Sequence, residues 1–277
     1  MSATQLDHAE VMTALRVKQQ QVWSSGDYNR IAALTVGVNE TLVSTAEIRP
    51  GATVLDVATG TGHAALAAAR TGARVTGIDY VPELLDVARG RAAAERLDVS
   101  FVEAPAEQLP FVEGSFDVVI SAIGVMFAAD HDRAAGELAR VARAGGRIAL
   151  AAWTRSGFVG GILGIVGKHV PPPPGAQSPV RWGEEDVVAE LLGERVADVQ
   201  SSLHVVTQRF TSAEAFADLF LTYYGPTRAA SMRLDEEGRT ALRAELVTLA
   251  KANDRGHGTG AGVVLDWEYR IVTATRR

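Results

Sequence analysis

Two glycines and two aspartates occur in the order that an adenosine-binding site needs. Asp56 ends a short apolar segment, and Gly60 and Gly62 follow it. Asp79 lies 17 residues after Gly62. Glycine tolerates positive φ angles and lets a ligand approach the backbone closely. A carboxylate beside such a loop can accept hydrogen bonds from both hydroxyls of a ribose. These residues therefore predict a site for an adenosine-containing cofactor.

Two strands and two helices must position these residues. The apolar residues of 53–56 predict a buried strand, and the alanine-rich run 64–70 predicts a helix after the glycine loop. A second apolar segment, 74–78, ends at Asp79, and Pro82 suits the first turn of the next helix. If the two strands lie side by side, Asp79 is brought next to the glycine loop.

Two cofactors fit this unit, and Asp56 discriminates between them. Residues 60–65 satisfy the loose pattern G-x-G-x-x-G/A of dinucleotide-binding proteins. The carboxylate of Asp56 would repel a diphosphate placed over this turn, whereas it would attract a cationic sulfonium. The sequence therefore favours S-adenosylmethionine (SAM) over NAD(P). An NAD(P)-dependent oxidoreductase is the rival hypothesis that the glycine pattern leaves open.

Three further segments complete an ordered set of motifs. Residues 101–111 read FVEAPAEQLPF, residues 114–121 read GSFDVVIS, and residues 138–153 read LARVARAGGRIALAAW. With the first unit, they resemble the class I SAM-dependent methyltransferases of the ubiquinone/menaquinone-biosynthesis type. The resemblance implies an α/β fold with a Rossmann-like, seven-stranded, mostly parallel sheet. The last strand would be antiparallel, between the fifth and the sixth, with N-terminal helices and an inserted cap or lid.

The resemblance also implies which residues contact the cofactor. Asp56 would lie near the methionine part of SAM, Asp79 would bind the ribose, and Tyr80 would lie against the adenine. Family members often place an acid after the third strand, but the matching position here is Pro105, so Ala106 or Glu107 is expected to replace it. The other expected contacts are loop residues Ala58, Gly60 and Gly62, Ser121 near the sulfonium, and Tyr28 as a donor to the SAM carboxylate.

The residues expected around the methyl acceptor are aromatic: Trp23, Phe127, Phe158, Tyr223 and Tyr224. Ordinary packing between helix and core is the alternative for Trp23. His131 is the candidate general base. Methyl transfer from a sulfonium depends mainly on alignment and water exclusion, so a catalytic triad is not required. No cluster of His, Asp and Glu has the spacing of a metal site, and no metal is expected.

Changes in composition divide the chain into four parts. Residues 1–48 are expected to form an N-terminal helical cap, and residues 49–154 the SAM-binding core. Residues 155–183 are rich in glycine and contain four consecutive prolines, which indicates an inserted lid. A crossover that merely packs on the surface is the alternative. Residues 184–277 are expected to complete the core and to add helical cap elements.

Composition narrows the choice of partners. The chain of 277 residues is 47% hydrophobic and 22% charged, as in globular proteins. A net charge of −6 offers no electrostatic footprint for nucleic acid. There is no cysteine, no stretch typical of a signal peptide and no apolar run long enough for a membrane span. We therefore expect a cytoplasmic monomer or homodimer that acts on a small molecule.

The sequence thus predicts methyl transfer from SAM to an O, N or C atom of a small hydrophobic or aromatic metabolite, leaving S-adenosylhomocysteine (SAH). A SAM-bound cyclase or decarboxylase would carry the same cofactor motifs. That second class stays open.

Overall fold

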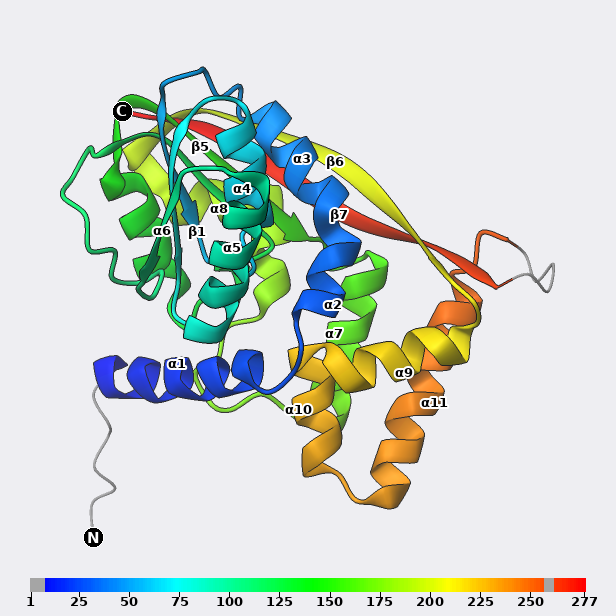
Figure 1. The fold of residues 1–277 in the computed structure, drawn as a ribbon. Coiled ribbons are helices and arrows are strands. Elements are labelled where there is room, and N and C mark those ends of the chain that lie inside the picture. Colours follow the sequence, from blue (N-terminus) through cyan, green and yellow to red (C-terminus); the bar gives the residue numbers. More distant parts are fainter. Residues whose placement is uncertain (1–7, 257–261) are drawn as a thin grey trace, which may run out of the picture.

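The computed structural model describes residues 8–256 and 262–277, and a seven-stranded sheet forms its centre (Figure 1). The strands are β1 (Thr53–Val57), β2 (Arg74–Asp79), β3 (Val99–Glu103), β4 (Phe116–Ala122), β5 (Ala142–Trp153), β6 (Val196–Phe210) and β7 (Val263–Arg276). Their order across the sheet is β3-β2-β1-β4-β5-β7-β6. Neighbours from β3 to β5 are parallel, and β7 is antiparallel to both β5 and β6. The predicted fold, including its antiparallel last strand, is confirmed.

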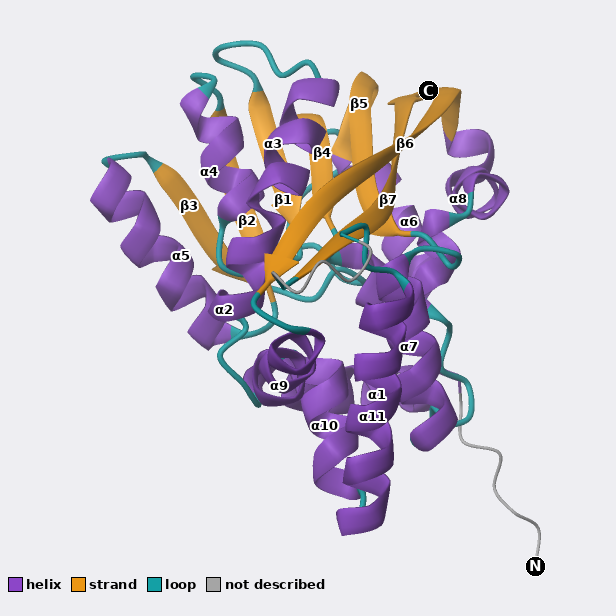
Figure 2. Cartoon of the chain, turned by 90° about the vertical axis from the view of Figure 1, so that its right-hand side faces the viewer, coloured by secondary structure: helices purple, strands orange, loops and turns teal. Residues whose placement is uncertain are grey.

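Helices cover both faces of the sheet (Figure 2). One face carries α3 (Val36–Thr45), α4 (His63–Arg70) and α5 (Pro82–Glu95), and the other carries α6 (His131–Val141) and α8 (Glu185–Leu192). Val54, Leu55 and Val57 in β1 are completely buried because helices lie on both sides of this strand. In the described part of the chain, short 3-10 helices lie at Ala33–Thr35, Val125–Phe127, Pro179–Gly183 and Gly193–Arg195.

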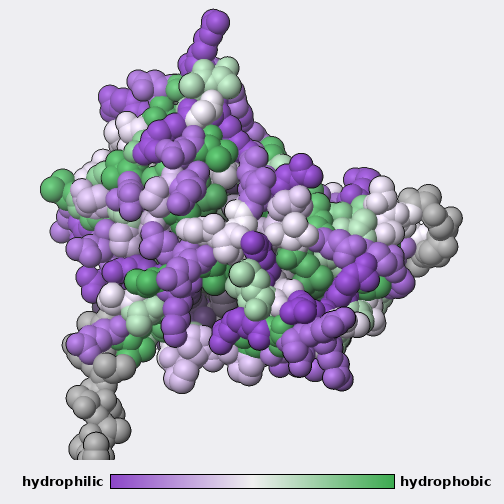
Figure 3. Space-filling view, turned by 60° about the horizontal axis from the view of Figure 1, so that its bottom comes forward, coloured by the Kyte–Doolittle hydropathy of each residue, from purple (hydrophilic) through white to green (hydrophobic). Residues whose placement is uncertain are grey.

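A helical lobe lies beyond the carboxyl ends of the parallel strands (Figures 1 and 2). It consists of α7 (Phe158–His169), α9 (Ala213–Tyr223), α10 (Gly225–Arg233) and α11 (Glu236–Ala252), with α1 (His8–Ser24) packed on α10. The short α2 (Asn29–Ala32) links α1 to the core. Hydrophilic and hydrophobic side chains are mixed over the face that this lobe presents in Figure 3.

Glycine and proline, which usually disfavour helices, occur in two helices of this lobe. The glycine-rich part of the expected lid forms α7, which packs against α10, α11 and β7. Gly225 and Pro226 form the first turn of α10, directly after α9 ends at Tyr223. Proline is tolerated in a first helical turn because the amide that it lacks would have no partner within the helix.

In the described parts of the chain, no helix is both long and apolar enough to cross a membrane. The same residues contain no group of three His, Asp or Glu side chains that could hold a metal ion.

Candidate cofactor site

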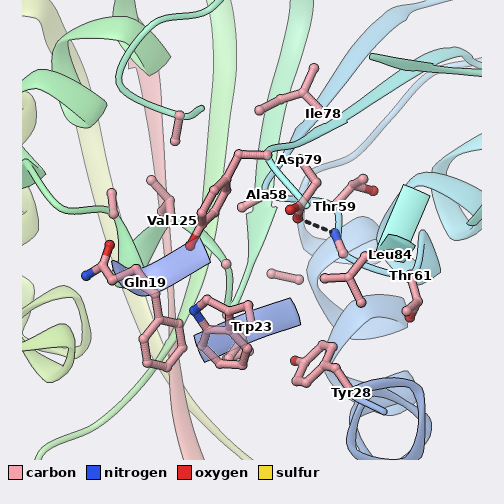
Figure 4. A pocket seen from close by; sticks show the side chains of 18 of the residues that line it. Gln19, Trp23, Tyr28, Ala58, Thr59, Thr61, Ile78, Asp79, Leu84 and Val125 are labelled. Carbon is pink, nitrogen blue, oxygen red and sulfur yellow. Dashed lines mark hydrogen bonds between the residues drawn. The ribbon is translucent and has the colours of Figure 1, made fainter. Parts of the chain in front are cut away.

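A pocket of about 810 Å³, counting its open mouth, lies at the carboxyl ends of β1, β2 and β4. The strand order reverses between β1 and β4, and open α/β sheets bind ligands at such a reversal. The segments after β1, β2, β3 and β4 form one side of the pocket. Gln19, Trp23 and Tyr28, from the N-terminal helices and their link, face Asp79 from the other side (Figure 4).

Three residues in the left-handed region shape the loop after β1. Ala58 and Gly60 both have φ of 54°, and Gly62 has φ of 84°. Gly62 precedes the first turn of α4, where a Cβ would lie 2.8 Å from the Cβ of Ala88 in α5. Glycine at position 62 therefore provides both the backbone conformation and the close approach of α4 to α5.

The carboxylate of Asp79 joins this loop to the end of β2 (Figure 4). Its Oδ2 accepts a hydrogen bond from the Gly60 amide at 2.8 Å, and its Oδ1 accepts one from the Val81 amide at 3.0 Å. Burial raises the pKa of Asp79 to about 6, although these two amides oppose the shift. The β1–β2 pairing therefore places a carboxylate that is mostly ionised at pH 7 beside the glycine loop, in the wall of the pocket.

Internal hydrogen bonds occupy several loop amides. Thr59 N–H donates to the Ile78 carbonyl at 2.8 Å, and Gly62 N–H donates to the Thr59 carbonyl at 2.9 Å. The Gly60 amide is bound to Asp79. A diphosphate over this turn would need N–H groups that are free to face it. Because these three amides are already paired, the geometry favours a ligand without a diphosphate.

Asp56 lies beneath the loop and is not a lining residue of the pocket. Its Oδ2 accepts a hydrogen bond from the Thr59 hydroxyl at 2.5 Å, and Thr59 itself lines the pocket. Burial raises the pKa of Asp56 to about 7, although the Thr59 hydroxyl and the Ala65 amide oppose the shift. Asp56 therefore positions Thr59, which in turn lines the pocket. Thr59 was not among the residues predicted from the sequence.

The other residues predicted to contact the cofactor lie in two places. Gly62 and Ser121 are behind the pocket wall, whereas six residues line it: Tyr28, Ala58, Gly60, Tyr80, Ala106 and Glu107. Ser121 Oγ donates to the Val57 carbonyl at 2.7 Å and accepts from the Val125 amide at 3.0 Å. Ser121 therefore ties the end of β4 to β1.

Glu107 and Tyr80 flank the part of the pocket formed after β2 and β3. Glu107 Oε1 accepts from the Ala129 amide at 2.7 Å, which fixes the turn before α6. The Tyr80 hydroxyl is buried and has no hydrogen-bond partner among the described residues. Burial raises the pKa of Tyr80, as do the charges of Asp79 and Glu107. This hydroxyl is a donor available to a ligand.

Aromatic rings extend the site away from the glycine loop. The Trp23 ring lies edge-on to the rings of Tyr28, Phe127 and Tyr224, at centroid distances of 5.2, 4.8 and 5.9 Å. Trp23, Tyr28 and Phe127 line the cofactor pocket. Tyr224 lines a second, smaller hollow that shares Tyr28 and Phe127 with the first. The two hollows therefore adjoin.

Two of the aromatic residues expected at the acceptor, Phe158 and Tyr223, are not lining residues of either hollow. Phe158 is buried in the core, where its ring stacks on Trp267 with an interplanar angle of 7°. Tyr223 is half-buried beneath the guanidinium of Arg30, which lies 5.3 Å from its ring centroid. Neither residue lines the two hollows.

The candidate base His131 is also outside both hollows. Its ring is fully buried and lies 5.6 Å from the Trp182 ring. Burial, with the charge of Arg181 nearby, lowers the pKa of His131 to about 4. The imidazole is therefore neutral at pH 7, but the geometry does not bring it to the cofactor pocket.

Several residues that line the pocket were not predicted from the sequence: Arg16, Gln19, Thr35, Asn39, Thr59 and Ile123. Gln20, next to Gln19 in α1, donates a hydrogen bond to the Tyr80 carbonyl and so seats α1 against the site. Ile123 has φ of 61°, which is unusual for a β-branched residue. No residue spacing predicts either feature, because both depend on how distant segments pack.

Ala58→Gly is expected to raise the free energy of unfolding by about 0.5–1 kcal/mol. Ala58 bears a side chain at φ of 54°, where glycine is less strained. Part of the gain is offset because glycine makes the unfolded chain more flexible. Urea denaturation measures the change, and a less stable variant would show that the Cβ of Ala58 contributes packing that outweighs the strain.

The fold and the site together define a class I SAM-dependent methyltransferase domain. A family described as "Methyltransferase domain" matches residues 55–150. An uncharacterised protein of Mycobacterium tuberculosis (strain ATCC 25618 / H37Rv) is 42% identical over 262 residues, which cover 93% of each chain. The chain belongs to the class I SAM-dependent methyltransferase family, and its similarity to this mycobacterial protein extends over nearly its whole length.

Two further similarities concern the core and the fold. Demethylmenaquinone methyltransferase of Thermus thermophilus is 42% identical over 125 residues, which cover 44% of this chain and 50% of that protein. The crystal structure of the [4+2]-cyclase SpnF has a TM-score of 0.55 at 19% identity, and the match covers 93% of this chain and 96% of that chain. The latter likeness shows a shared fold only.

Proposed function

We propose that this protein binds SAM and transfers its methyl group to an O, N or C atom of a small hydrophobic or aromatic metabolite by in-line displacement. The observation that carries the proposal is the pair of hydrogen bonds by which Asp79 clamps the Gly60 and Val81 amides. One buried carboxylate holds the glycine loop and lines a pocket whose loop amides are largely paired. A ribose diol and a cationic sulfonium suit this site better than a diphosphate does.

The chain's own residues would bind and orient the cofactor and the methyl acceptor, and they would exclude water from the reacting groups. SAM, when bound, supplies an already activated methyl group. Asp79 would accept from the ribose hydroxyls, and its carboxylate would give the pocket a negative charge that complements a sulfonium. Trp23 and Tyr28 would cover the reacting groups, which supports transfer mainly through alignment. A cytoplasmic location and a small-molecule acceptor are part of the same proposal.

Calorimetric titration of ligand-stripped protein with SAH, NADH and NADPH tests the cofactor. We expect binding of SAH and no binding of either nicotinamide cofactor. The reverse result would contradict the proposal and direct attention to hydride-transfer substrates.

A second function, cyclisation or decarboxylation with bound SAM, is favoured by one observation. The similar fold of the [4+2]-cyclase SpnF shows that this architecture is not restricted to methyl transfer. Product mass with methyl-labelled SAM separates the two functions. Incorporation of the label with release of SAH supports methyl transfer, whereas an unlabelled product supports the second function.

Lowering the pH from 7.5 to 5.5 is expected to weaken SAH binding. Burial raises the pKa of Asp79 to about 6, and only the carboxylate can accept from both ribose hydroxyls without carrying a proton itself. If only the ionised form binds, affinity falls about 4-fold at pH 5.5. Calorimetry at both pH values measures this change, and Asp79→Asn, which cannot titrate, should lose it.

The stability of the ligand-free protein should change in the opposite direction. The folded pKa values of Asp79 and Asp56, about 6 and about 7, lie above those of the unfolded chain. Their contribution to stability is therefore fully present below the unfolded value and is lost as the pH rises through 6 to 7. Urea denaturation from pH 5 to pH 8 should show this loss. A rise over that interval would contradict the assigned shifts.

A further inference from the structure

We propose that β6, the strand at the edge of the sheet, is the interface of a homodimer in which two copies of β6 pair antiparallel about a two-fold axis at His204. The sheet of each copy would then continue into the sheet of its partner. This inference does not depend on the proposed function, because β6 contributes no residue to the cofactor pocket.

Strand β6 has a neighbouring strand on one side only. It stands at the end of the sheet, and it crosses in front of the other strands in Figure 2. Among the described residues, the backbone of residues 199–209 forms its backbone hydrogen bonds with β7 alone. Since a strand can pair on both sides, the N–H and C=O groups that point away from β7 are available to a second strand.

The sequence of this edge lacks the features that usually keep two edge strands apart. Residues 199–208 contain no Pro, Lys, Arg, Asp or Glu. Leu203 and Val205, on one face of the strand, are 54% and 53% exposed. The other face is covered near Gln208, whose Nε2 donates to the Leu34 carbonyl at 2.6 Å. An uncharged edge with exposed apolar side chains favours pairing with another strand.

Two charged residues flank this uncharged stretch. Asp198 and Arg209 are exposed, and neither has an ion-pair partner among the described residues. Antiparallel pairing of two copies brings the Asp198 end of one strand to the Arg209 end of the other. Parallel pairing would bring like charges together. The charges of the edge therefore match a second copy of the same strand in the antiparallel direction.

A bulge in β6 sets the spacing between these charges. Ala197 pairs with Thr275 of β7, and Gln200 pairs with Thr273. Residues 198–199 therefore share one position of the ladder, as in a β-bulge. Counted in ladder positions, the bulge and Arg209 are equally far from His204.

One register consequently satisfies the apolar and the charged residues together. With His204 on the two-fold axis, Leu203 lies opposite the partner's Val205, and the bulge with Asp198 lies opposite the partner's Arg209. Each contact occurs twice, because the same surface is used on both copies. The dimer would thus have apolar pairs next to its axis and an ion pair at each end.

Sedimentation velocity of the full chain, at concentrations up to about 100 µM, measures the dimer because a short interface binds weakly. Val205→Lys places a charge opposite each Leu203 and should raise the dissociation constant at least about 10-fold. Val112→Lys is the matched control, since Val112 is 77% exposed in the connection before β4, and it should leave the constant unchanged. Thermal melting checks that both variants fold.

A charge reversal tests the ends of the interface. Arg209→Asp would place two aspartates opposite each other at each end, and it should raise the dissociation constant about 5-fold. Adding Asp198→Asn to this variant removes the repulsion and should recover part of the loss. Asparagine suits this position because Asp198 has φ of 53°.

Single cysteines test the register, because the chain contains no cysteine of its own. His204→Cys would place two thiols opposite each other at the axis, within reach of a disulfide, so mild oxidation should give a covalent dimer. Ser202→Cys is the control on the same face of the strand. Its thiols would lie four ladder positions apart, roughly 14 Å, and should not react.

A chain that stays monomeric at the highest concentration would overturn the proposal, as would a dimer that Val205→Lys leaves intact. Equal crosslinking of the two cysteine variants, or none with His204→Cys, would overturn the register. All of these measurements are made without SAH. Failure of SAH binding would therefore contradict the proposed function and leave the result for the dimer unchanged.

Discussion

Asp79→Ala is expected to weaken SAH binding by about 1.5–3 kcal/mol, roughly 10- to 150-fold. The carboxylate is proposed to accept from both ribose hydroxyls, and hydrogen bonds to a charged group are among the stronger ones. The substitution also frees the Gly60 and Val81 amides, which Asp79 binds at 2.8 and 3.0 Å. Loss of this clamp adds to the loss of direct contacts.

Calorimetry with SAH measures the effect, and two variants separate its causes. Asp86→Ala removes an exposed carboxylate of the adjacent helix α5 and should leave SAH affinity unchanged. Asp79→Asn keeps the size of the side chain but turns one acceptor into a donor, so one backbone amide loses its partner. It should lose nearly as much affinity as Asp79→Ala. Unchanged affinity in both Asp79 variants would mean that Asp79 is not the ribose ligand.

Gly62→Ala is expected to lower the free energy of unfolding by about 2–4 kcal/mol. The added Cβ would lie 2.8 Å from the Cβ of Ala88 and 3.1 Å from Cδ1 of Leu66. In addition, φ of 84° is unfavourable for any residue with a side chain. Both costs act at the packed contact between α4 and α5, where the backbone has little room to shift.

Urea denaturation measures this loss against a matched control. Gly90 in α5 has no atom within 4 Å of an added Cβ and is exposed, so Gly90→Ala should raise stability by about 0.5–1 kcal/mol. Opposite signs for the two glycines would support the packing argument. A Gly62→Ala variant as stable as the parent would show that α4 and α5 can separate at little cost.

The cofactor unit was predictable because its signals are local. Apolar strands, glycines and an acid at fixed spacing define β1, the loop, α4, β2 and Asp79 from neighbouring residues alone.

The sequence by itself determined the strands β1 and β2, the glycine loop after β1 and the position of Asp79 at the end of β2. Only the tertiary structure placed Asp56 behind Thr59 and left His131 outside the pocket. It also formed the second, smaller hollow, whose lining residues Tyr28, Phe220, Tyr224 and Trp267 come from widely separated segments. Side chains so distant in the chain converge only through the packing of helices on the sheet. The spacing of residues along the chain predicts local geometry, but it does not predict how distant segments pack.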